Sequence, residues 1–410
     1  MTTSSGFGGI PRDSLLLGIS TFAFIAATNI LTPLLPEVRD EFGVSIATAG
    51  LIVGSYGLAR LLIDLPAGFL ADRVGHRRIS IIAVILLVAS SLLGWAATSV
   101  EMLIASRVVS GIAAGTLGTV QVAALAATAT GPARGRIMSV FGLANNAGIA
   151  VYPLLGGVIG AVWGWRPTFL VTAVLAVVAG VVLLGILSRL QLGHGSARGG
   201  GSDPELVLEG PAKTRASFAI NFGVVAMMVH RAGVRNTILP LYAATVLGLS
   251  GVNIATALAF MAVSGLLVAT PGGMAGDRFG RRRVIVTGLI AIAAGDLALI
   301  LTHDLVTFLL VAGLVGFGDF FTASQTALLT EIVPAAERTR TLSGYRFASD
   351  LGAMIGPIIL AAVMDTADTR TALILAVAIL VTAATLTYTF VPSRVDALRI
   401  RRASSKATQA

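Results

Sequence analysis

The stretch GFLADRVGHRR, from Gly68 to Arg78, has the same pattern as the stretch GMAGDRFGRRR, from Gly273 to Arg283. Both contain glycine, three residues, Asp-Arg, one residue, glycine, one residue and Arg-Arg, 205 positions apart. Each charged phrase stands between two long apolar stretches. This recurrence indicates that the chain consists of two related halves.

Other short stretches recur in the same order as the charged phrase, at offsets between 204 and 208 positions. They are NILTPL (29–34) with NTILPL (236–241), SIATA (45–49) with NIATA (253–257), and GIAVYP (148–153) with GAMIGP (352–357). The repeat therefore extends over most of the chain, and both copies have the same direction. Parallel repeats of this kind are one of the architectures of membrane transporters.

The composition predicts a membrane protein. Of 410 residues, 55% are hydrophobic and only 12% are charged, with a mean hydropathy of +0.89, whereas soluble domains contain about 25% charged residues. The apolar runs are long enough for the roughly 20 residues that a helix needs to cross a bilayer. A porin-like barrel would show alternating segments of about 10 residues instead. The sequence contains no cysteine, which excludes disulfides and thiolate metal sites.

We therefore expect an all-α membrane protein with twelve transmembrane helices in two six-helix, pseudo-symmetric bundles. The expected spans are 14–36, 46–70, 79–98, 102–129, 137–161, 167–189, 217–245, 253–275, 284–302, 306–332, 341–364 and 370–391. The expected organisation is an N-terminal bundle (1–190), a Gly-rich linker (191–216), a C-terminal bundle (217–392) and a basic tail (393–410).

The distribution of basic residues predicts the orientation. Five of the 29 lysines and arginines fall inside spans, and three fall in loops on one side, at Arg39, Arg166 and Arg370. All the others lie on the side that both termini share, and the positive-inside rule makes that side cytoplasmic. The net charge of +9 thus reflects topology rather than nucleic-acid binding. We expect a multi-pass protein of the bacterial inner membrane without a cleavable signal peptide.

These motifs resemble the major facilitator superfamily, in particular its bacterial drug:proton antiporter branch. The resemblance covers essentially the whole chain. The loop signature of that family is complete twice, at Gly68, Asp72, Arg73, Gly75, Arg77 and Arg78, and at Gly273, Asp277, Arg278, Gly280, Arg282 and Arg283. A second signature appears as RVVSG, from Arg107 to Gly111. The antiporter motif of the fifth helix appears as Gly148, Pro153, Gly156 and Gly157, with Tyr152 in place of one glycine.

The resemblance implies two bundles that rock about a central site. It also implies that Asp72 forms a cytoplasmic latch with the eleventh helix, the helix that carries Asp350, and that Arg107 takes part in proton coupling. For Arg77 and Arg78, an effect on orientation alone remains an alternative. The fifth-helix glycines and Pro153 would bend that helix and permit close packing.

Nine ionisable residues fall inside the expected spans, where a charge costs about 2.5–3.5 kcal/mol at mid-bilayer on insertion scales. They are Arg60, Asp64, Arg107, Arg231, Arg235, Asp296, Asp319, Arg346 and Asp350. They must line a polar cavity or pair with one another. Arg60 with Asp64, and Arg346 with Asp350, have the i,i+4 spacing of ion pairs within one helix.

A proton carrier needs a carboxylate whose pKa is raised by burial and not lowered by a nearby arginine. Asp319, in GFGDFF, has no basic neighbour in sequence, so we predict it as the leading proton site. Asp296, in AAGDLAL, ranks second because the resemblance places its helix at the periphery. Asp64 is a further candidate, and helix packing is an alternative role for Asp296.

Arg231 and Arg235 lie four residues apart in the seventh span with no acid nearby in sequence. Arginine binds carboxylate and phosphate groups through paired hydrogen bonds, so these two are the expected ligands of a substrate. Pairing with Asp319 or Asp64 is the alternative. Polar side chains expected to bind substrate beside them, or else to join helices, are Asn29, Gln121, Asn145, Asn236 and Gln325. His230 is expected as a packed histidine or a proton relay.

The predicted function is secondary active transport: proton-coupled export of small amphiphilic molecules, drug-like or lipid-like, by a monomer. The alternatives are a metabolite or organic-anion transporter of the same superfamily, and a membrane sensor without flux. No phosphate-binding loop of the GxxxxGK[ST] type is present, which argues against direct use of ATP. We expect no enzymatic activity, no cofactor and no metal.

Overall fold

The computed structural model describes residues 12–128, 134–190, 208, 210–321, 325–334 and 337–393. Its elements are α1 (Arg12–Asn29), η2 (Thr32–Leu34), α2 (Leu35–Phe42), α3 (Ile46–Val74), α4 (His76–Trp95), α5 (Val100–Thr128), α6 (Arg134–Trp163), α7 (Pro167–Leu187), α8 (Gly210–Met228), η4 (Val229–Ile238), α9 (Leu239–Thr245), α10 (Gly251–Phe279), α11 (Arg281–Ala298), η5 (Leu299–Leu301), α12 (Leu305–Phe321), α13 (Gln325–Glu331), α14 (Arg338–Thr366) and α15 (Thr369–Phe390).

Each of the twelve predicted spans coincides with helix in the described residues. Eleven helical stretches there are long and apolar enough to cross a membrane, and the shorter apolar helix Leu305–Asp319 supplies the tenth predicted span. The first span is interrupted after Asn29, and the described residues of the tenth span belong to α12 and α13. Helix α8 begins at Gly210, inside the predicted linker. The rest of the linker, apart from residue 208, and the tail beyond residue 393 lie outside the described residues.

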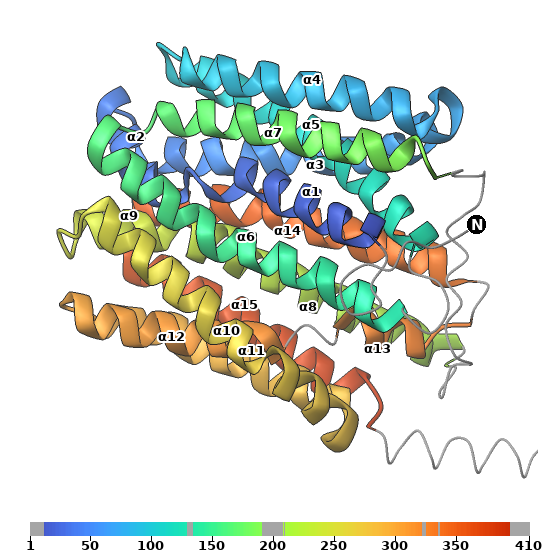
Figure 1. Cartoon of the computed structure of the whole chain (residues 1–410). Coiled ribbons are helices and arrows are strands. Elements are labelled where there is room, and N and C mark those ends of the chain that lie inside the picture. Colours follow the sequence, from blue (N-terminus) through green and yellow to red (C-terminus); the bar gives the residue numbers. More distant parts are fainter. Residues whose placement is uncertain are drawn as a thin grey trace, which may run out of the picture.

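The two halves form two bundles, as the repeat predicts. In Figure 1, helices α1 to α7, in blue to green, make up the upper part of the molecule and helices α9 to α12 the lower part, while α14, in orange, runs behind α1 and α6. The bundles meet where α3 packs against α14 and where α6 packs against α10. Buried apolar residues form separate clusters within each half, such as the one around Leu87 and Leu117 and the one around Leu289 and Leu380.

Helices α3 and α10 show that the halves repeat in structure as well as in sequence. Both have 29 residues, and each begins with a serine N-cap, Ser45 or Ser250, that accepts a backbone N–H. Both end at a glycine of the charged phrase, with φ of 97° at Gly75 and 93° at Gly280. A side chain with a Cβ is strained at such angles, so each signature glycine has a local structural reason.

The structure has two ends that differ in charge. The basic end carries Arg73, Arg77, Arg78, Arg278 and Arg283, which are all exposed. The opposite, distal end carries the turns at Gly43, Gly164 and Gly248, where φ is positive. In Figure 1 the distal end is on the left, with α2 and α9, and the basic end is on the right.

One face of α3 shows that the bundles touch at the distal end and separate toward the basic end. The seam residues Gly50, Gly54, Gly57, Asp64 and Gly68 are separated by three, four or seven positions, so they share this face. A Cβ at Gly50 would lie 2.3 Å from the Ala361 Cβ, and one at Gly57 would lie 2.9 Å from the backbone of Ala353. A Cβ at Gly68 would meet no atom of the described residues within 4 Å. The two halves thus form a wedge that is open at the basic end.

Candidate functional site

Three adjoining cavities lie between the bundles, and Asn145 lines all of them. The central cavity has a volume of about 340 Å³ and is lined by residues that include Asn29, Tyr56, Arg60, Arg107, Arg231, Arg235, Asn236 and Asp350. The C-side cavity, of about 280 Å³, is lined by residues that include Asn146, Arg231, Arg235, Asp319, Gln325 and Tyr345. The N-side cavity, of about 270 Å³, is lined by residues that include Arg60, Asp64, Gln121 and Arg346. Together they provide the space that a small organic ligand requires.

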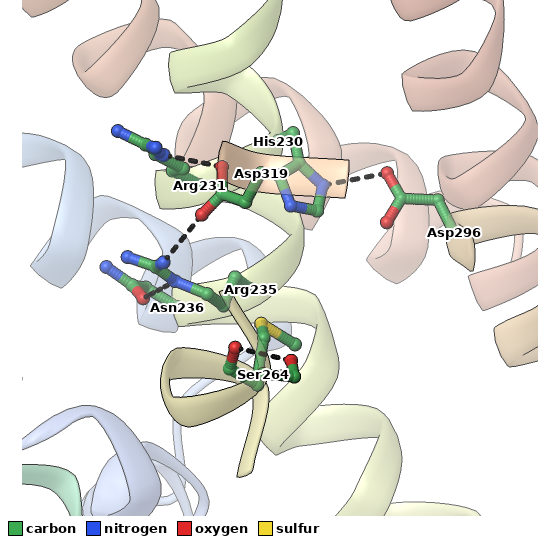
Figure 2. Close-up of polar contacts among 8 residues, drawn as sticks. His230, Arg231, Arg235, Asn236, Ser264, Asp296 and Asp319 are labelled. Carbon is green, nitrogen blue, oxygen red and sulfur yellow. Dashed lines mark hydrogen bonds and ion pairs between the residues drawn. The ribbon is translucent and has the colours of Figure 1, made fainter. Parts of the chain in front are cut away.

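The most concentrated charge in these cavities is a cluster of two arginines and one aspartate, shown in Figure 2. Arg231 Nε donates to Asp319 Oδ1 at 2.8 Å, and Arg235 Nη1 donates to Asp319 Oδ2 at 3.3 Å. The prediction of Asp319 as proton site rested on the absence of a basic neighbour in sequence, but in the fold two arginines of η4 contact its carboxylate. The role of Asp319 as proton site stays a prediction. The alternative, in which Asp319 pairs with both arginines, is the one that the structure contains.

The backbone that carries the two arginines explains why both reach one carboxylate. Segment η4 is a π-helix, and its wide turn, closed by i→i+5 hydrogen bonds, brings residues four apart nearly into line. The Leu239 amide accordingly donates to the Val234 carbonyl. Pro240 follows directly; it lacks an N–H, and its ring hinders a regular α-helical turn before it. π-Helical segments occur frequently at functional sites.

A second pair lies on the other side of the same segment. His230 Nδ1 lies 2.9 Å from Asp296 Oδ2, which joins η4 to α11. The side chains are 1% and 0% exposed, and neither residue lines the three cavities described above. Asp296, a predicted proton-coupling residue, is thus held by a histidine inside the C-terminal bundle.

A third charged group crosses the seam between the bundles. Arg60 Nε lies 3.2 Å from Asp350 Oδ1, without the alignment of a hydrogen bond, and Asp350 also interacts with Asp64. The expected pair of Arg60 with Asp64 within α3 is therefore wrong, and Arg60 bridges α3 and α14 instead. Sequence spacing alone could not reveal a partner 290 positions away.

Arg107 is buried beside the central cavity, at 6% exposure. Its Nη1 donates to the Ala27 carbonyl at 2.9 Å, and its guanidinium lies 4.9 Å from the ring centroid of Tyr56. A cation over an aromatic face is stabilised by the ring quadrupole. Tyr56, which also lines this cavity together with Arg60, is a site residue that the sequence reasoning missed. Tyr345 in the C-side cavity is another, and neither has a distinctive sequence pattern.

The five neutral side chains predicted to bind substrate all line at least one cavity. Some of them also make internal bonds: Asn29 donates to the Ile25 carbonyl at 3.2 Å, and Gln121 donates to Ser20 Oγ at 3.3 Å. Gln325 is buried, and its Nε2 has no partner among the described residues. Asn145 has the most central position of the set, because it lines all three spaces.

The two copies of the charged phrase make different contacts. Asp72, Arg73, Arg77 and Arg78 are exposed and form no ion pair with the described residues. In the second copy, Arg282 donates to the Val391 carbonyl at 2.9 Å and lies over the ring of Tyr388, and Arg281 pairs with Glu331 at 2.7 Å. The side chain of Asp277 is not among those that the structure describes. The predicted latch of Asp72 stays a prediction.

Comparison with known proteins adds relatives over most of the chain. A chloramphenicol resistance protein of Streptomyces lividans is 27% identical over 362 residues, which are 86% of this chain and 89% of that protein. The cephamycin export protein CmcT of Amycolatopsis lactamdurans is 34% identical over 173 residues, which are 42% of this chain and 35% of that protein. The chain thus spans about a third of the latter's length.

Solved structures share the fold. A POT family transporter in complex with 5-aminolevulinic acid superposes with a TM-score of 0.78 at 12% identity, over 94% of this chain and 97% of that one. A bacterial homologue of the human lysosomal transporter Spinster, solved inward-facing and occupied, superposes with a TM-score of 0.72 at 17% identity, over 93% of this chain and 97% of that one. The sequence profile described as Major Facilitator Superfamily matches residues 17–270 and 221–408. With two related bundles around a polar central cavity, the chain belongs to the Major Facilitator Superfamily and is a multi-pass membrane transporter.

Proposed function

We propose that this protein exports small amphiphilic molecules across the inner membrane by alternating access, coupled to protons that move inward. The proposal rests on one observation above all: the bundles are packed together at the distal end and apart at the basic end, with the cavities between them. The positive-inside rule makes the basic end cytoplasmic. The cavities of this conformation would then open to the cell interior, where an exporter loads its cargo.

The lining of the cavities supports a neutral or anionic cargo. The central cavity contains four arginines, Arg60, Arg107, Arg231 and Arg235, against one acid, Asp350. Their surplus positive charge opposes a cation and attracts a carboxylate or phosphate. Apolar side chains such as Ile52, Val53 and Ile149 line the same space and suit the apolar part of an amphiphile. The printed names of two relatives, a chloramphenicol resistance protein and a cephamycin exporter, are in keeping with such cargo.

Within this scheme the cargo competes with Asp319 for the two arginines. A polar group of the cargo would replace one carboxylate oxygen on Arg231 or Arg235, and Asp319 would return when the cargo leaves. Moving one proton inward across 100 mV supplies about 2.3 kcal/mol, enough to drive export against a gradient. The protein would act as a monomer in the lipid bilayer.

The positive cavity also favours the alternative of an organic-anion or metabolite transporter. Purified protein in proteoliposomes, with an imposed pH gradient, separates the possibilities through two probes, neutral chloramphenicol and anionic salicylate. Export-type antiport predicts probe movement opposite to the proton gradient. Salicylate movement alone, independent of pH, would establish the alternative, and no flux above protein-free liposomes with either probe would favour the sensor.

Variants test the site in the same assay. Arg231→Ala and Arg235→Ala should weaken probe binding, whereas Arg370→Ala, which removes an exposed arginine outside the three cavities, is the matched control. If Asp319→Asn abolished proton-driven flux but kept probe exchange at equal pH, Asp319 would be necessary for proton coupling. Unchanged coupling in Asp319→Asn would remove Asp319 as the carrier and leave its role with the arginines.

A further inference from the structure

The buried pair of His230 and Asp296 leaves some of its hydrogen-bonding atoms without a partner. An ionisable pair inside a protein is costly unless its remaining hydrogen-bonding atoms are satisfied. Here Asp296 Oδ1 and His230 Nε2 are both buried and have no partner among the described residues. Apolar side chains of α11, such as Leu289 and Ile292, are fully buried next to this site. A half-satisfied pair in an apolar setting points to a function rather than to packing.

The pair is connected to the cavity through its neighbours. His230 precedes Arg231, which lines the C-side cavity, and His230 interacts electrostatically with Asp319 as well as with Asp296. In Figure 2 the imidazole stands between the two carboxylates, with Nδ1 on the Asp296 side. The unpartnered Nε2 belongs to the other side of the ring. One side chain therefore lies between the cavity cluster and the sealed carboxylate.

His230 interacts with Asp296 on α11 and with Asp319 on α12. Arg231 and Arg235 lie on η4 itself. The elements packed against η4 carry further ionisable groups: Tyr345, Arg346 and Asp350 on α14, Tyr56, Arg60 and Asp64 on α3, Tyr242 on α9, Lys213 and Arg215 on α8, and Arg370 and Tyr388 on α15. The carboxylates of Asp296 and Asp319 together balance the guanidiniums of Arg231 and Arg235. A proton on His230 would therefore add one uncompensated positive charge to this group.

We propose that His230 and Asp296 together form the proton-binding site of the transport cycle, an assignment that rests on the proposed proton-coupled transport. In the unloaded state, neutral His230 donates its Nδ1–H to the Asp296 carboxylate. A hydronium ion gives one proton to Nε2, an N–H bond forms, and water remains. Asp296 keeps the Nδ1–H and holds the resulting imidazolium in place.

Protonation at this site acts on the cargo site through Asp319. An imidazolium attracts the Asp319 carboxylate, so it competes with Arg231 and Arg235 for the same group. When His230 is protonated, the arginines are held less tightly by Asp319, and when the proton leaves, Asp319 returns to them. The π-helical turn places His230 and Arg231 on different sides of one segment, which connects a sealed proton site to an open binding site.

Nuclear magnetic resonance of imidazole nitrogens tests the site without any substrate. The chain has only four histidines, His76, His194, His230 and His303, so ¹⁵N-histidine labelling gives few signals, and His230→Gln identifies one set. We expect acidification to add a proton to Nε2 of His230, and we expect Asp296→Asn to change how the His230 signals respond to acid. His230 signals that do not respond to acid would overturn the proposal.

Transport measurements in proteoliposomes provide the second readout, with chloramphenicol as the probe. His230→Gln and Asp296→Asn should lose pH-driven probe movement but keep exchange of probe at equal pH, and exposed His303→Gln is the matched control. The double variant His230→Leu/Asp296→Leu removes both groups without an unpaired charge, so it remains usable if a single variant does not fold. Retained pH-driven movement in the double variant would overturn the proposal. If the wild-type protein shows no pH-driven movement, the proposed function fails, and the nitrogen titration alone decides on the site.

Discussion

The two halves differ in how the first helix of the repeat continues near its proline. In the N-terminal half, α1 ends at Asn29 and a 3₁₀ turn follows around Pro33 before α2. In the C-terminal half, the corresponding chain remains helical through the π-helical segment η4, up to Pro240. Both prolines remove a backbone donor at the same place in the repeat. Only in the second half is the proline preceded by a π-helical segment, η4, with charged side chains on two sides.

The side chains in matching positions show what this difference means. The positions of His230 and Arg231 correspond to Ala23 and Phe24 in the first half, and Asp296 corresponds to Ser91. Ser91 is buried and satisfied by the Leu87 carbonyl at 2.8 Å, so it costs little. Buried Arg107 is the exception in the N-terminal half. The two bundles therefore share one fold, but most of the buried ionisable residues lie in the C-terminal bundle.

The largest expected effect on stability follows from replacing Asp319, the acid that pairs with Arg231 and Arg235. Asp319 corresponds to Ala114 in the first half, and Asp319→Ala copies that half. Breaking a buried ion pair costs about 3–5 kcal/mol because a charge is left unpaired, so thermal denaturation in detergent should show a strongly destabilised protein. An unchanged midpoint would mean that Asp319 does not hold the arginines in solution.

The matched control replaces the whole cluster by its N-terminal equivalents. A variant with Arg231→Phe, Arg235→Thr and Asp319→Ala carries the residues of the first half at these positions and leaves no unpaired charge. We expect it to recover much of the lost stability but not probe binding. If it is as unstable as Asp319→Ala alone, the halves differ in packing and not only in charge.

The next largest effect is expected where α3 packs against α14, and it concerns the opening of the distal end. Gly57→Leu would place a side chain against the backbone of Ala353, and such overpacking costs about 1–3 kcal/mol, which should push the distal ends apart. Because the chain has no cysteine, Ser349→Cys in the central cavity can be labelled with an impermeant thiol reagent without background. We expect labelling from the distal face only when Gly57→Leu is present. Gly68→Leu, on the same face of α3 but in open space, should leave labelling unchanged.

The fold was accessible from the sequence because bilayer physics constrains it so strongly. Apolar runs fix the spans, and the repeated phrases fix the two bundles, down to the turns at Gly75 and Gly280. The pairing of charges was not accessible, since it depends on which helices face each other. Arg60 illustrates this: its one-turn neighbour Asp64 is the natural guess, yet Asp350 on the other half is its ion-pair partner. The π-helical turn that aligns Arg231 with Arg235 likewise has no sequence signature beyond Pro240.

Loss of the serine N-cap of α3 or of α10 should have a smaller effect on stability, of equal size in the two halves. Ser45 Oγ accepts the Thr48 amide at 3.2 Å, and Ser250 Oγ accepts the Asn253 amide at 3.4 Å. Replacing a serine N-cap by alanine costs about 1 kcal/mol, so Ser45→Ala and Ser250→Ala should lower the denaturation midpoint by similar amounts. A clear inequality would indicate that the two bundles unfold separately and with different stabilities.

The smallest expected effect is on how stability depends on acid, and it comes from an N-cap that differs between the halves. Ser99 Oγ accepts the Met102 amide before α5, whereas Asp304, the matching residue before α12, accepts the amide of Thr307 at 2.8 Å. Hydrogen bonds from the Thr307 amide and hydroxyl hold the pKa of Asp304 below its ordinary value. The stabilisation is therefore present above the unfolded pKa of about 3.9 and is lost as the pH falls through the lower folded value. Asp304→Ser should therefore lower the denaturation midpoint slightly at neutral pH and make its fall in acid shallower, and an unchanged acid profile would show that the Asp304 cap does not contribute.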